Sequence, residues 1–403
     1  MWHGSTQAVR SFLQISPTFI GSGPSPVRSS RPSTPGPKQG EVLAWTRQRL
    51  APTVRAMTHL GSRAQALGLA LAALLVLSCA SSQTPTADEP KASAEAFVDP
   101  LPSWNDNGTK SKIIDFVRAV SDPENPAFVE PEERVATFDN DGTLWVEQPI
   151  YTELAFALHR VNDLARVHPE WKAQQPFQAV IEGDLDALVA SGTRGLVEIV
   201  LASHTGMSTT LFATIVTEWV RDARHPKYEQ PYTELTYQPQ IELLRYLEAN
   251  GFKTFIVSGG SVEFMRTFTE EVYGIPPERV VGSSIETRFE VQGGKPSLLR
   301  LPRVDFVDDK SGKPVGIHKH IGRRPILAFG NSDGDLEMLQ WTTVGSAGAR
   351  LGLLLHHDDA EREYAYDRES SVGKLDRALD AAGASGWLVV SMKNDWNTVF
   401  AQE

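Results

Sequence analysis

Residues 136–145 read ATFDNDGTLW. A short apolar run ends in two aspartates, Asp139 and Asp141, and Gly142 and Thr143 follow directly. Building a fold does not require two carboxylates at the mouth of a buried strand, because two nearby negative charges repel each other unless something compensates them. The pattern therefore indicates a functional site in which something compensates these two charges.

Several other segments resemble the apolar start of this stretch. Each is as short as a buried parallel strand and follows a helix-like or irregular segment. The predicted strands cover residues 135–138, 254–257, 280–285, 326–329 and 351–355. The sequence therefore predicts an α/β protein with a Rossmann-like, doubly wound parallel sheet.

The gap between the first two predicted strands is unusually long. More than a hundred residues separate Asp139 from residue 254, whereas such connections usually hold a few residues and one helix. Apolar residues recur at helical spacing inside the gap. We therefore predict an all-helical cap domain at residues 148–244, inserted into a core made of residues 101–147 and 245–403. Its position places it over the sheet edge where such folds bind ligands.

Charge is distributed unevenly along the chain. Residues 1–79 contain eight Lys and Arg and one acidic residue, so the remainder contains 31 basic and 49 acidic residues, a net charge of −18. A body this acidic repels nucleic acids and anionic membrane surfaces. We therefore expect no nucleic acid partner, and the sequence indicates no obligate protein partner.

Residues 57–79 have the layout of an export signal. Their apolar run at 66–77 is too short to span a bilayer comfortably and ends close to Cys79, the sole cysteine. The segment VLSC resembles a bacterial lipobox, and this resemblance implies that Cys79 is lipidated. A plain signal peptide or a short anchor that happens to contain Cys is the alternative. The resemblance implies a lipid-anchored protein of the bacterial cell envelope, at the outer membrane and facing the periplasm, whose only membrane contact is this anchor.

The segments on either side of this signal contain no predicted fold. Residues 1–56 are rich in Pro, Ser, Gly and Arg and would place the signal internally. We expect translation to start at Met57, so that residues 1–56 are an upstream extension or disordered. Residues 80–100 are small, polar and punctuated by proline, which is typical of a flexible linker.

Four segments, in order along the chain, resemble the motifs of the haloacid dehalogenase-like (HAD) hydrolase superfamily. They are FDNDGTLW (138–145), FIVSGGS (255–261), GKPVGI (312–317) and LAFGNSDGDLEML (327–339). The helical insert resembles the cap of the phosphoserine phosphatase branch. This resemblance implies a Mg²⁺-dependent phosphatase that hydrolyses a small phosphomonoester through an aspartyl-phosphate intermediate.

The resemblance also implies roles for the two aspartates of the first motif. Asp139 would attack phosphorus, a role that carboxylates fill in covalent catalysis. Asp141 would protonate the leaving oxygen and then activate water. We expect the Gly142-Thr143 turn to bend the chain so that the two carboxylates can cooperate.

The second and third motifs imply a phosphate-binding set. Ser258 and Gly259 would offer a hydroxyl and free N–H groups at a helix start, and an N-cap role for Ser258 is compatible with this. Lys313 best resembles the lysine that balances the charges of phosphate and nucleophile. Lys310 and Lys319 lie close enough in sequence to be alternatives.

The fourth motif departs from the family pattern at Asn331, where many relatives have an aspartate. Magnesium prefers hard oxygen ligands, and Asn can supply a carbonyl oxygen. The implied Mg²⁺ ligands are Asp139, the main-chain carbonyl of Asp141, Asn331 and Asp335. Asp333 is the alternative to Asp335.

Other residues and two rival functions complete the predictions. We interpret Glu147 as a surface glutamate, and residues 356–359, His-His-Asp-Asp, as a loop and not a second metal site.

One rival function is that of a lipoprotein with the HAD fold that binds or scaffolds without turnover, for which Asn331 is the best argument. The other is a carbon-attacking dehalogenase, against which Asp141 counts.

Overall fold

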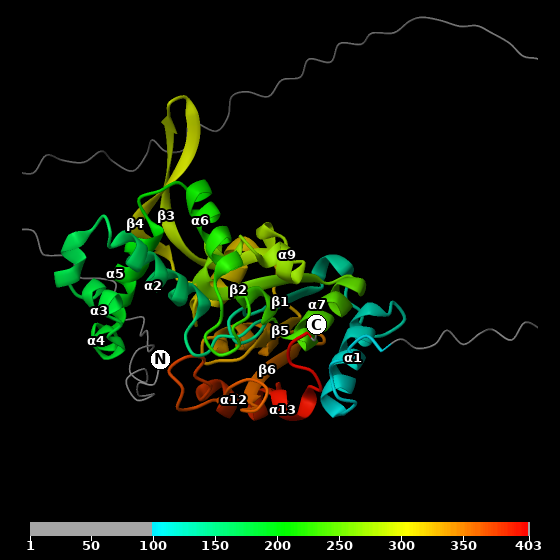
Figure 1. The fold of residues 1–403 in the computed structure, drawn as a ribbon. Helices are drawn as coiled ribbons and strands as arrows, with labels where there is room; N and C mark the ends of the chain where they lie inside the picture. The colour runs from blue at the N-terminus through cyan, green and yellow to red at the C-terminus, as the bar shows by residue number, and fades with distance from the viewer. Residues whose placement is uncertain (1–98, 402–403) are drawn as a thin grey trace, which may run out of the picture. The chain divides into compact units, whose positions relative to one another are not determined.

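The computed structural model describes residues 99–401 (Figure 1). The predictions for the lipobox, for Cys79 and for the upstream segments lie outside the described residues. Within residues 99–401, none of the helices combines the length and apolar character needed to cross a bilayer.

A central, mostly parallel sheet organises the described residues. Its strand order is β4-β3-β2-β1-β5-β6-β7, with β8 paired to β6. The strands are β1 (Val135–Phe138), β2 (Lys253–Ser261), β3 (Val280–Gln292), β4 (Lys295–Phe306), β5 (Leu327–Gly330), β6 (Leu351–Asp358), β7 (Ala365–Tyr366) and β8 (Leu388–Ser391). All four residues of β1 are buried. β1 pairs in parallel with β2 on one side and β5 on the other.

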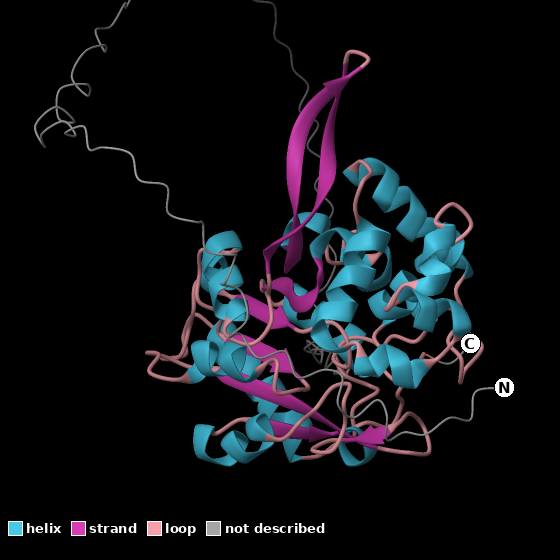
Figure 2. Ribbon diagram, turned by 90° about the vertical axis from the view of Figure 1, so that its left-hand side faces the viewer, coloured by secondary structure: helices cyan, strands magenta, loops and turns pink. Residues whose placement is uncertain are grey.

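Helices cover both faces of this sheet (Figure 2). Alternate residues of a strand point to opposite faces, and accordingly Leu327 and Phe329 of β5 belong to one apolar cluster and Ala328 to another. The predicted doubly wound α/β architecture is therefore confirmed. The helices outside the insert are α1 (Gly108–Ser121), α7 (Gln238–Ala249), α8 (Val262–Met265), α9 (Thr269–Tyr273), α10 (Gly312–His320), α11 (Leu336–Thr343), α12 (Arg377–Ser385) and α13 (Met392–Asp395).

The predicted helical insert is also present. Its helices are α2 (Thr152–Leu164), α3 (Phe177–Glu182), α4 (Leu185–Ala190), α5 (Gly192–His204) and α6 (Thr209–Asp222). They bury an apolar cluster of their own that includes Val161, Trp171 and Ile199. The predicted cap boundary at residue 244 falls inside α7, which packs beside β2 of the core.

A long hairpin formed by β3 and β4 projects from the sheet (Figures 1 and 2). β3 pairs in parallel with β2 as far as Ser283 and then runs antiparallel to β4. Gly293 and Gly294 form the turn, both with positive φ, as tight two-residue hairpins require. The prediction for 280–285 covered only the start of β3. The Gly-Gly pair between two β-rich runs is the signal that could have revealed the hairpin.

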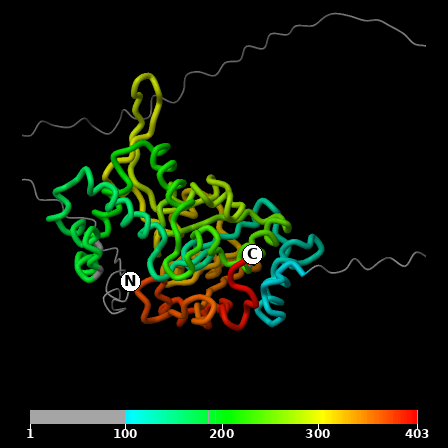
Figure 3. The backbone as a smooth tube through the Cα atoms, in the orientation of Figure 1, coloured from blue at the N-terminus to red at the C-terminus, as the bar shows by residue number. Residues whose placement is uncertain are grey.

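The beginning and end of the described segment lie side by side (Figure 3). The Asn105 N–H donates to the Asp395 carbonyl over 2.8 Å. The rings of Trp104 and Trp396 meet edge to face, with centroids 5.8 Å apart. The C-terminal residues therefore complete the same core that begins at α1.

Candidate active site

The first and fourth motifs meet where β1 and β5 end. Asp139 follows β1, and its N–H donates to the carbonyl of Phe329 over 2.9 Å. Asp335 closes the loop after β5, because its Oδ2 accepts the N–H groups of Asn331 (3.0 Å) and Ser332 (3.1 Å). Gly330 is needed here, since a Cβ at this position would overlap the Asp335 carboxylate.

Lys313, at the start of α10, joins these two carboxylates. Its Nζ donates to Asp139 Oδ1 (2.7 Å), to Asp335 Oδ1 (2.5 Å) and to the carbonyl of Val257 (2.9 Å). Burial lowers the pKa of Lys313, but the charges of Asp139 and Asp335 outweigh it and raise this pKa, so the ammonium stays charged. The alternative Lys319 lies instead over the ring of Phe306.

Asp139 is only 7% exposed. Burial and the charge of Asp335 raise the pKa of its carboxyl above the usual value, while Lys313 opposes them. Lys313 is one cation shared by two carboxylates, so its charge alone does not balance the pair. With both carboxylates ionised, the site is therefore short of positive charge.

Asp141 turns toward the second motif. Gly142 has φ of +75°, and the indole Nε1 of Trp145 donates to Asp141 Oδ1 over 2.8 Å. A Cβ placed on Gly260 would lie 3.8 Å from Asp141 Oδ2 and 3.5 Å from Ser258 Oγ. The bend at Gly142 thus directs Asp141 toward Ser258. Burial raises the pKa of Asp141 to about 6, with Trp145 lowering it and Glu153 raising it further.

The surroundings of Ser258 and Gly259 differ from the prediction. Ser258 is buried, and its Oγ accepts the N–H of Gly260 over 3.1 Å. β2 continues to Ser261 and pairs again with β3 there, so α8 starts only at Val262. The helix start expected at Ser258 and Gly259 was therefore wrong, and Ser258 does not cap α8.

Glu147 is buried beside the site, so its interpretation as a surface glutamate was wrong. The residue is 2% exposed. Its Oε1 accepts from Asn331 Nδ2 (2.6 Å) and from the hydroxyl of Tyr366 (2.8 Å). Burial raises the pKa of Glu147 well above its usual range, the Tyr366 hydrogen bond lowers it, and the charges of Asp141 and Asp139 raise it. Sequence spacing could not show this burial, because Tyr366 lies 219 positions away.

The alternative acid of the fourth motif has a structural partner. Asp333 Oδ1 accepts the N–H groups of Asp376 (3.0 Å) and Ala378 (2.9 Å) at the start of α12. Asp335, by contrast, faces Lys313. The structure thus brings together Asp139, Lys313 and Asp335 and directs Asp333 to α12.

The adjacent histidines lie in β6 and not in the predicted loop, although they point in opposite directions as expected. His357 is buried, with Nε2 2.7 Å from the carbonyl oxygen of Gly142 and Nδ1 3.2 Å from Glu363 Oε2. His356 lies 3.4 Å from Asp367. His357 therefore contacts the turn of the first motif at the carbonyl oxygen of Gly142.

The helical insert touches the second motif through Glu153 of α2. Glu153 Oε2 accepts the N–H of Ser261 over 2.7 Å, and Oε1 lies 3.1 Å from Nε2 of His204 in α5. A Cβ on Gly260 would lie 3.2 Å from Glu153 Oε2. The insert therefore borders the space that Asp141 and Ser258 face.

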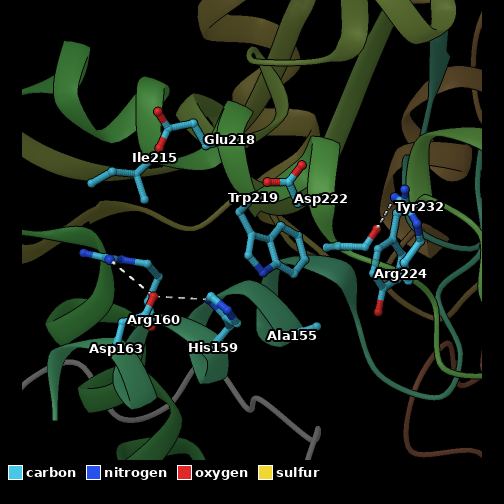
Figure 4. A pocket seen from close by; sticks show the side chains of 11 residues that line it. Ala155, His159, Arg160, Asp163, Ile215, Glu218, Trp219, Asp222, Arg224 and Tyr232 are labelled. Carbon is cyan, nitrogen blue, oxygen red and sulfur yellow. Dashed lines mark hydrogen bonds and ion pairs between the residues drawn. The ribbon is translucent and has the colours of Figure 1, made fainter. Parts of the chain in front are cut away.

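A hollow of about 560 Å³ lies elsewhere, between α2 and α6 (Figure 4). Charged side chains of both signs line it around Trp219: Arg160, Asp163, Glu218, Asp222 and Arg224. It contains none of the motif residues, so it is separate from the candidate active site.

The donor set fits a hard divalent cation. The predicted ligands offer oxygen only: the Asp139 carboxylate, the Asp141 main-chain carbonyl and Asn331 Oδ1, with Asp335 next to them. In the described part of the chain, no group of three or more His, Cys, Asp and Glu is arranged to hold a metal. A cation held by the predicted ligands would bind carbonyl oxygens as well as carboxylates.

Comparisons with known proteins agree with the motifs. The family model for haloacid dehalogenase-like hydrolases matches residues 136–340, just over half of the chain, and this range includes all four motifs. The comparison with curated proteins finds no match. Among solved structures, a protein of unknown function from Anaerococcus prevotii has 16% identity and a TM-score of 0.42, over 66% of this chain and 96% of that one. A phosphoserine phosphohydrolase-like protein from Francisella tularensis has 16% identity and a TM-score of 0.33, over 62% and 98%.

Proposed function

The chain belongs to the haloacid dehalogenase-like hydrolase family, and from this premise we propose that it is a Mg²⁺-dependent phosphatase acting on a small phosphomonoester. The observation that carries the proposal is the bridge from Lys313 to Asp139 and Asp335. This bridge brings the proposed nucleophile Asp139, the buried cation Lys313 and the fourth-motif acid Asp335 together at one edge of the sheet.

In the proposed reaction, Asp139 attacks phosphorus and forms an aspartyl-phosphate. Lys313 donates to Oδ1 of Asp139, which fixes the carboxylate and leaves Oδ2 to attack. The charge of Lys313 also offsets the charge of the incoming phosphate. Ser258, which lies next to Val257 and faces the same space, would hold a phosphate oxygen.

Asp141 supplies the proton transfers. With a pKa of about 6, it exists in both protonation states near neutral pH, as an acid that later acts as a base requires. It would protonate the leaving oxygen and then take a proton from the attacking water. The hydrogen bond from Trp145 fixes its orientation in both steps.

Mg²⁺ would be held by Asp139, the main-chain carbonyl of Asp141 and Asn331, with Asp335 beside them. Bound there, it supplies positive charge that stabilises the phosphoryl oxygens. The contact between Glu153 and Ser261 brings the insert over the second motif. A site covered in this way favours a small substrate over a polymer.

Release of phosphate from p-nitrophenyl phosphate, with Mg²⁺ or with EDTA, tests the proposal. We expect release that needs Mg²⁺ and is lost in Asp139→Asn. The matched control is Asp333→Asn, which changes a carboxylate used at α12 and should keep most of the activity. Release that persists in Asp139→Asn would contradict the mechanism. No release from any member of a broad phosphomonoester panel would favour the rival binding function.

The location of the protein is a second part of the proposal. We propose that Cys79 is lipidated and that the enzyme is anchored in the cell envelope, facing the periplasm. The support is the order of apolar run, small residues and sole cysteine at residues 66–79. Membrane fractionation and mass spectrometry of the N-terminal peptide test this, and an unmodified Cys79 in the mature protein would contradict it.

A further inference from the structure

Asn331 connects two segments of the site through a neutral amide. Its Oδ1 accepts from Thr143 Oγ1 over 3.1 Å, and its Nδ2 donates to Glu147 Oε1 over 2.6 Å. Asn331 is 1% exposed, Thr143 is fully buried and Glu147 is 2% exposed. The position at which relatives place an aspartate is therefore neutral here and lies in direct contact with a buried carboxylate.

The place of the Glu147 carboxylate is built by several distant parts of the chain. Tyr366 donates its hydroxyl to Oε1 over 2.8 Å. Gly142 and Gly373 leave room, since a Cβ at either position would overlap Oε1. Both glycines have positive φ, which independently favours glycine there. These contacts fix the position of the Glu147 carboxylate. A glutamate that only meets solvent would not need them.

The neighbours of Glu147 leave its charge uncompensated. Its two hydrogen-bond donors, the Asn331 amide and the Tyr366 hydroxyl, are both neutral. Lys313 gives its hydrogen bonds to Asp139, Asp335 and a carbonyl. A buried carboxylate without an opposite charge is costly, and a cation beside Glu147 would offset that cost.

We propose that Glu147 supplies the divalent cation site with the negative charge that Asn331 lacks. The inference rests on the proposed function, because it assumes that Asp139 and the Asp141 carbonyl hold the cation. Glu147 lies against Gly142, the residue directly after Asp141, which places its charge next to these ligands. Charge count and rigidity set the affinity of oxygen sites for such ions, so Glu147 and Asn331 together replace one aspartate.

Mn²⁺ titration of the purified full-length protein without substrate, followed by the electron paramagnetic resonance signal of free Mn²⁺, tests the proposal. We expect Glu147→Gln to weaken Mn²⁺ binding by about 10- to 100-fold, the range typical of groups that support metal ligands. Glu242→Gln is the matched control. Glu242 is also a buried glutamate, and it accepts from the N–H and hydroxyl of Ser103, remote from the motifs. Its substitution should leave the affinity unchanged.

The double variant Glu147→Gln with Asn331→Asp separates charge from packing. It moves the negative charge from position 147 to position 331, and we expect it to recover Mn²⁺ affinity to within about threefold of the wild type. Failure of this recovery would overturn the proposal, because Glu147 would then act through packing alone. Unchanged Mn²⁺ affinity in Glu147→Gln would also overturn the proposal. In that case, Mn²⁺ binding by the wild-type protein would still support the proposed function.

Asn331→Asp alone keeps the test decisive if Glu147→Gln does not fold. The added carboxylate would face Glu147, so we expect a lower melting temperature without metal and tighter Mn²⁺ binding than in the wild type. A variant with wild-type affinity would contradict the proposal. Absence of Mn²⁺ binding in the wild type itself would instead contradict the proposed function, on which this inference rests.

Discussion

Two buried charged regions of this molecule differ in how their charges balance. Arg300 of β4 is fully buried, lies 3.2 Å from Glu263 of α8, donates to the His204 carbonyl over 2.6 Å and stacks on Phe212 at 4.0 Å. One cation there meets one carboxylate, a neutral acceptor and a ring. This balanced group ties the hairpin to the insert and to α8.

The region around Lys313 is unbalanced by comparison. Its one ammonium bonds to both Asp139 and Asp335. The carboxylates of Asp141 and Glu147 lie nearby and receive no hydrogen bond from this ammonium. In our proposal, balanced charge goes with a structural role, and excess negative charge goes with a place for a cation. Substitutions in each of the two regions test this contrast.

Lys313→Met should have the largest effect. It leaves Asp139 and Asp335 buried without a cation, and breaking a buried pair in this way costs about 3–5 kcal/mol. Activity should be lost as well. Urea denaturation measures the stability, with Lys319→Met as the exposed control. Equal stability of the two variants would contradict the assigned role of Lys313.

Arg300→Met should destabilise the protein by about 2–3 kcal/mol, because Glu263 is partly exposed and regains some solvation. The thermal stabilisation produced by Mg²⁺ should stay at the wild-type value. Thermal melts with Mg²⁺ and with EDTA check both statements. Loss of the Mg²⁺ effect would mean that the two regions are coupled and that the contrast between them fails.

The sequence predicts the site better than it predicts the residues around it. Asp139, Lys313 and Asp335 were identifiable because each lies in a segment that resembles a family motif, and the ends of parallel strands meet at one edge. The burial of Glu147 depends on Tyr366, which no local pattern relates to it. For the fold, short apolar runs revealed the parallel strands, because both faces of such a sheet are buried.

The hairpin escaped prediction for the opposite reason. Phe289 and Leu298 lie opposite each other near its tip and are largely exposed. No buried face therefore gave β3 and β4 the pattern of core strands. The role of Arg300 was equally hidden, since it depends on contacts with the insert.

Gly142→Ala should cost about 1–3 kcal/mol, because φ is positive and the new Cβ would overlap Asn331 and Glu147. The matched control is Gly345→Ala, where φ is +65° and no atom lies within 4 Å of a Cβ. Only the backbone penalty applies to the control. Thermal melts should show the larger loss for Gly142→Ala, with a reduced effect of Mg²⁺. Equal losses would argue against the tight packing inferred at Gly142.

The smallest effect concerns pH. Burial raises the pKa of Asp141 from 3.8 to about 6, so the folded protein binds this proton more tightly than the unfolded chain does. The stability from this group is present below pH 4 and is lost as pH rises toward and through 6. In EDTA this lowers the melting temperature by a few degrees. Mg²⁺ should offset the loss, so its stabilising effect should grow between pH 5 and 7, and a constant effect would contradict the charge argument.

The central claim is that the carboxylates at the ends of β1 and β5 are completed by one divalent cation. Calorimetric titration of Mg²⁺ into the wild type and into Asp139→Asn tests it most directly. We expect one Mg²⁺ per chain in the wild type and no measurable binding in the variant. Equal affinity in both proteins, or no binding in the wild type, would contradict the claim.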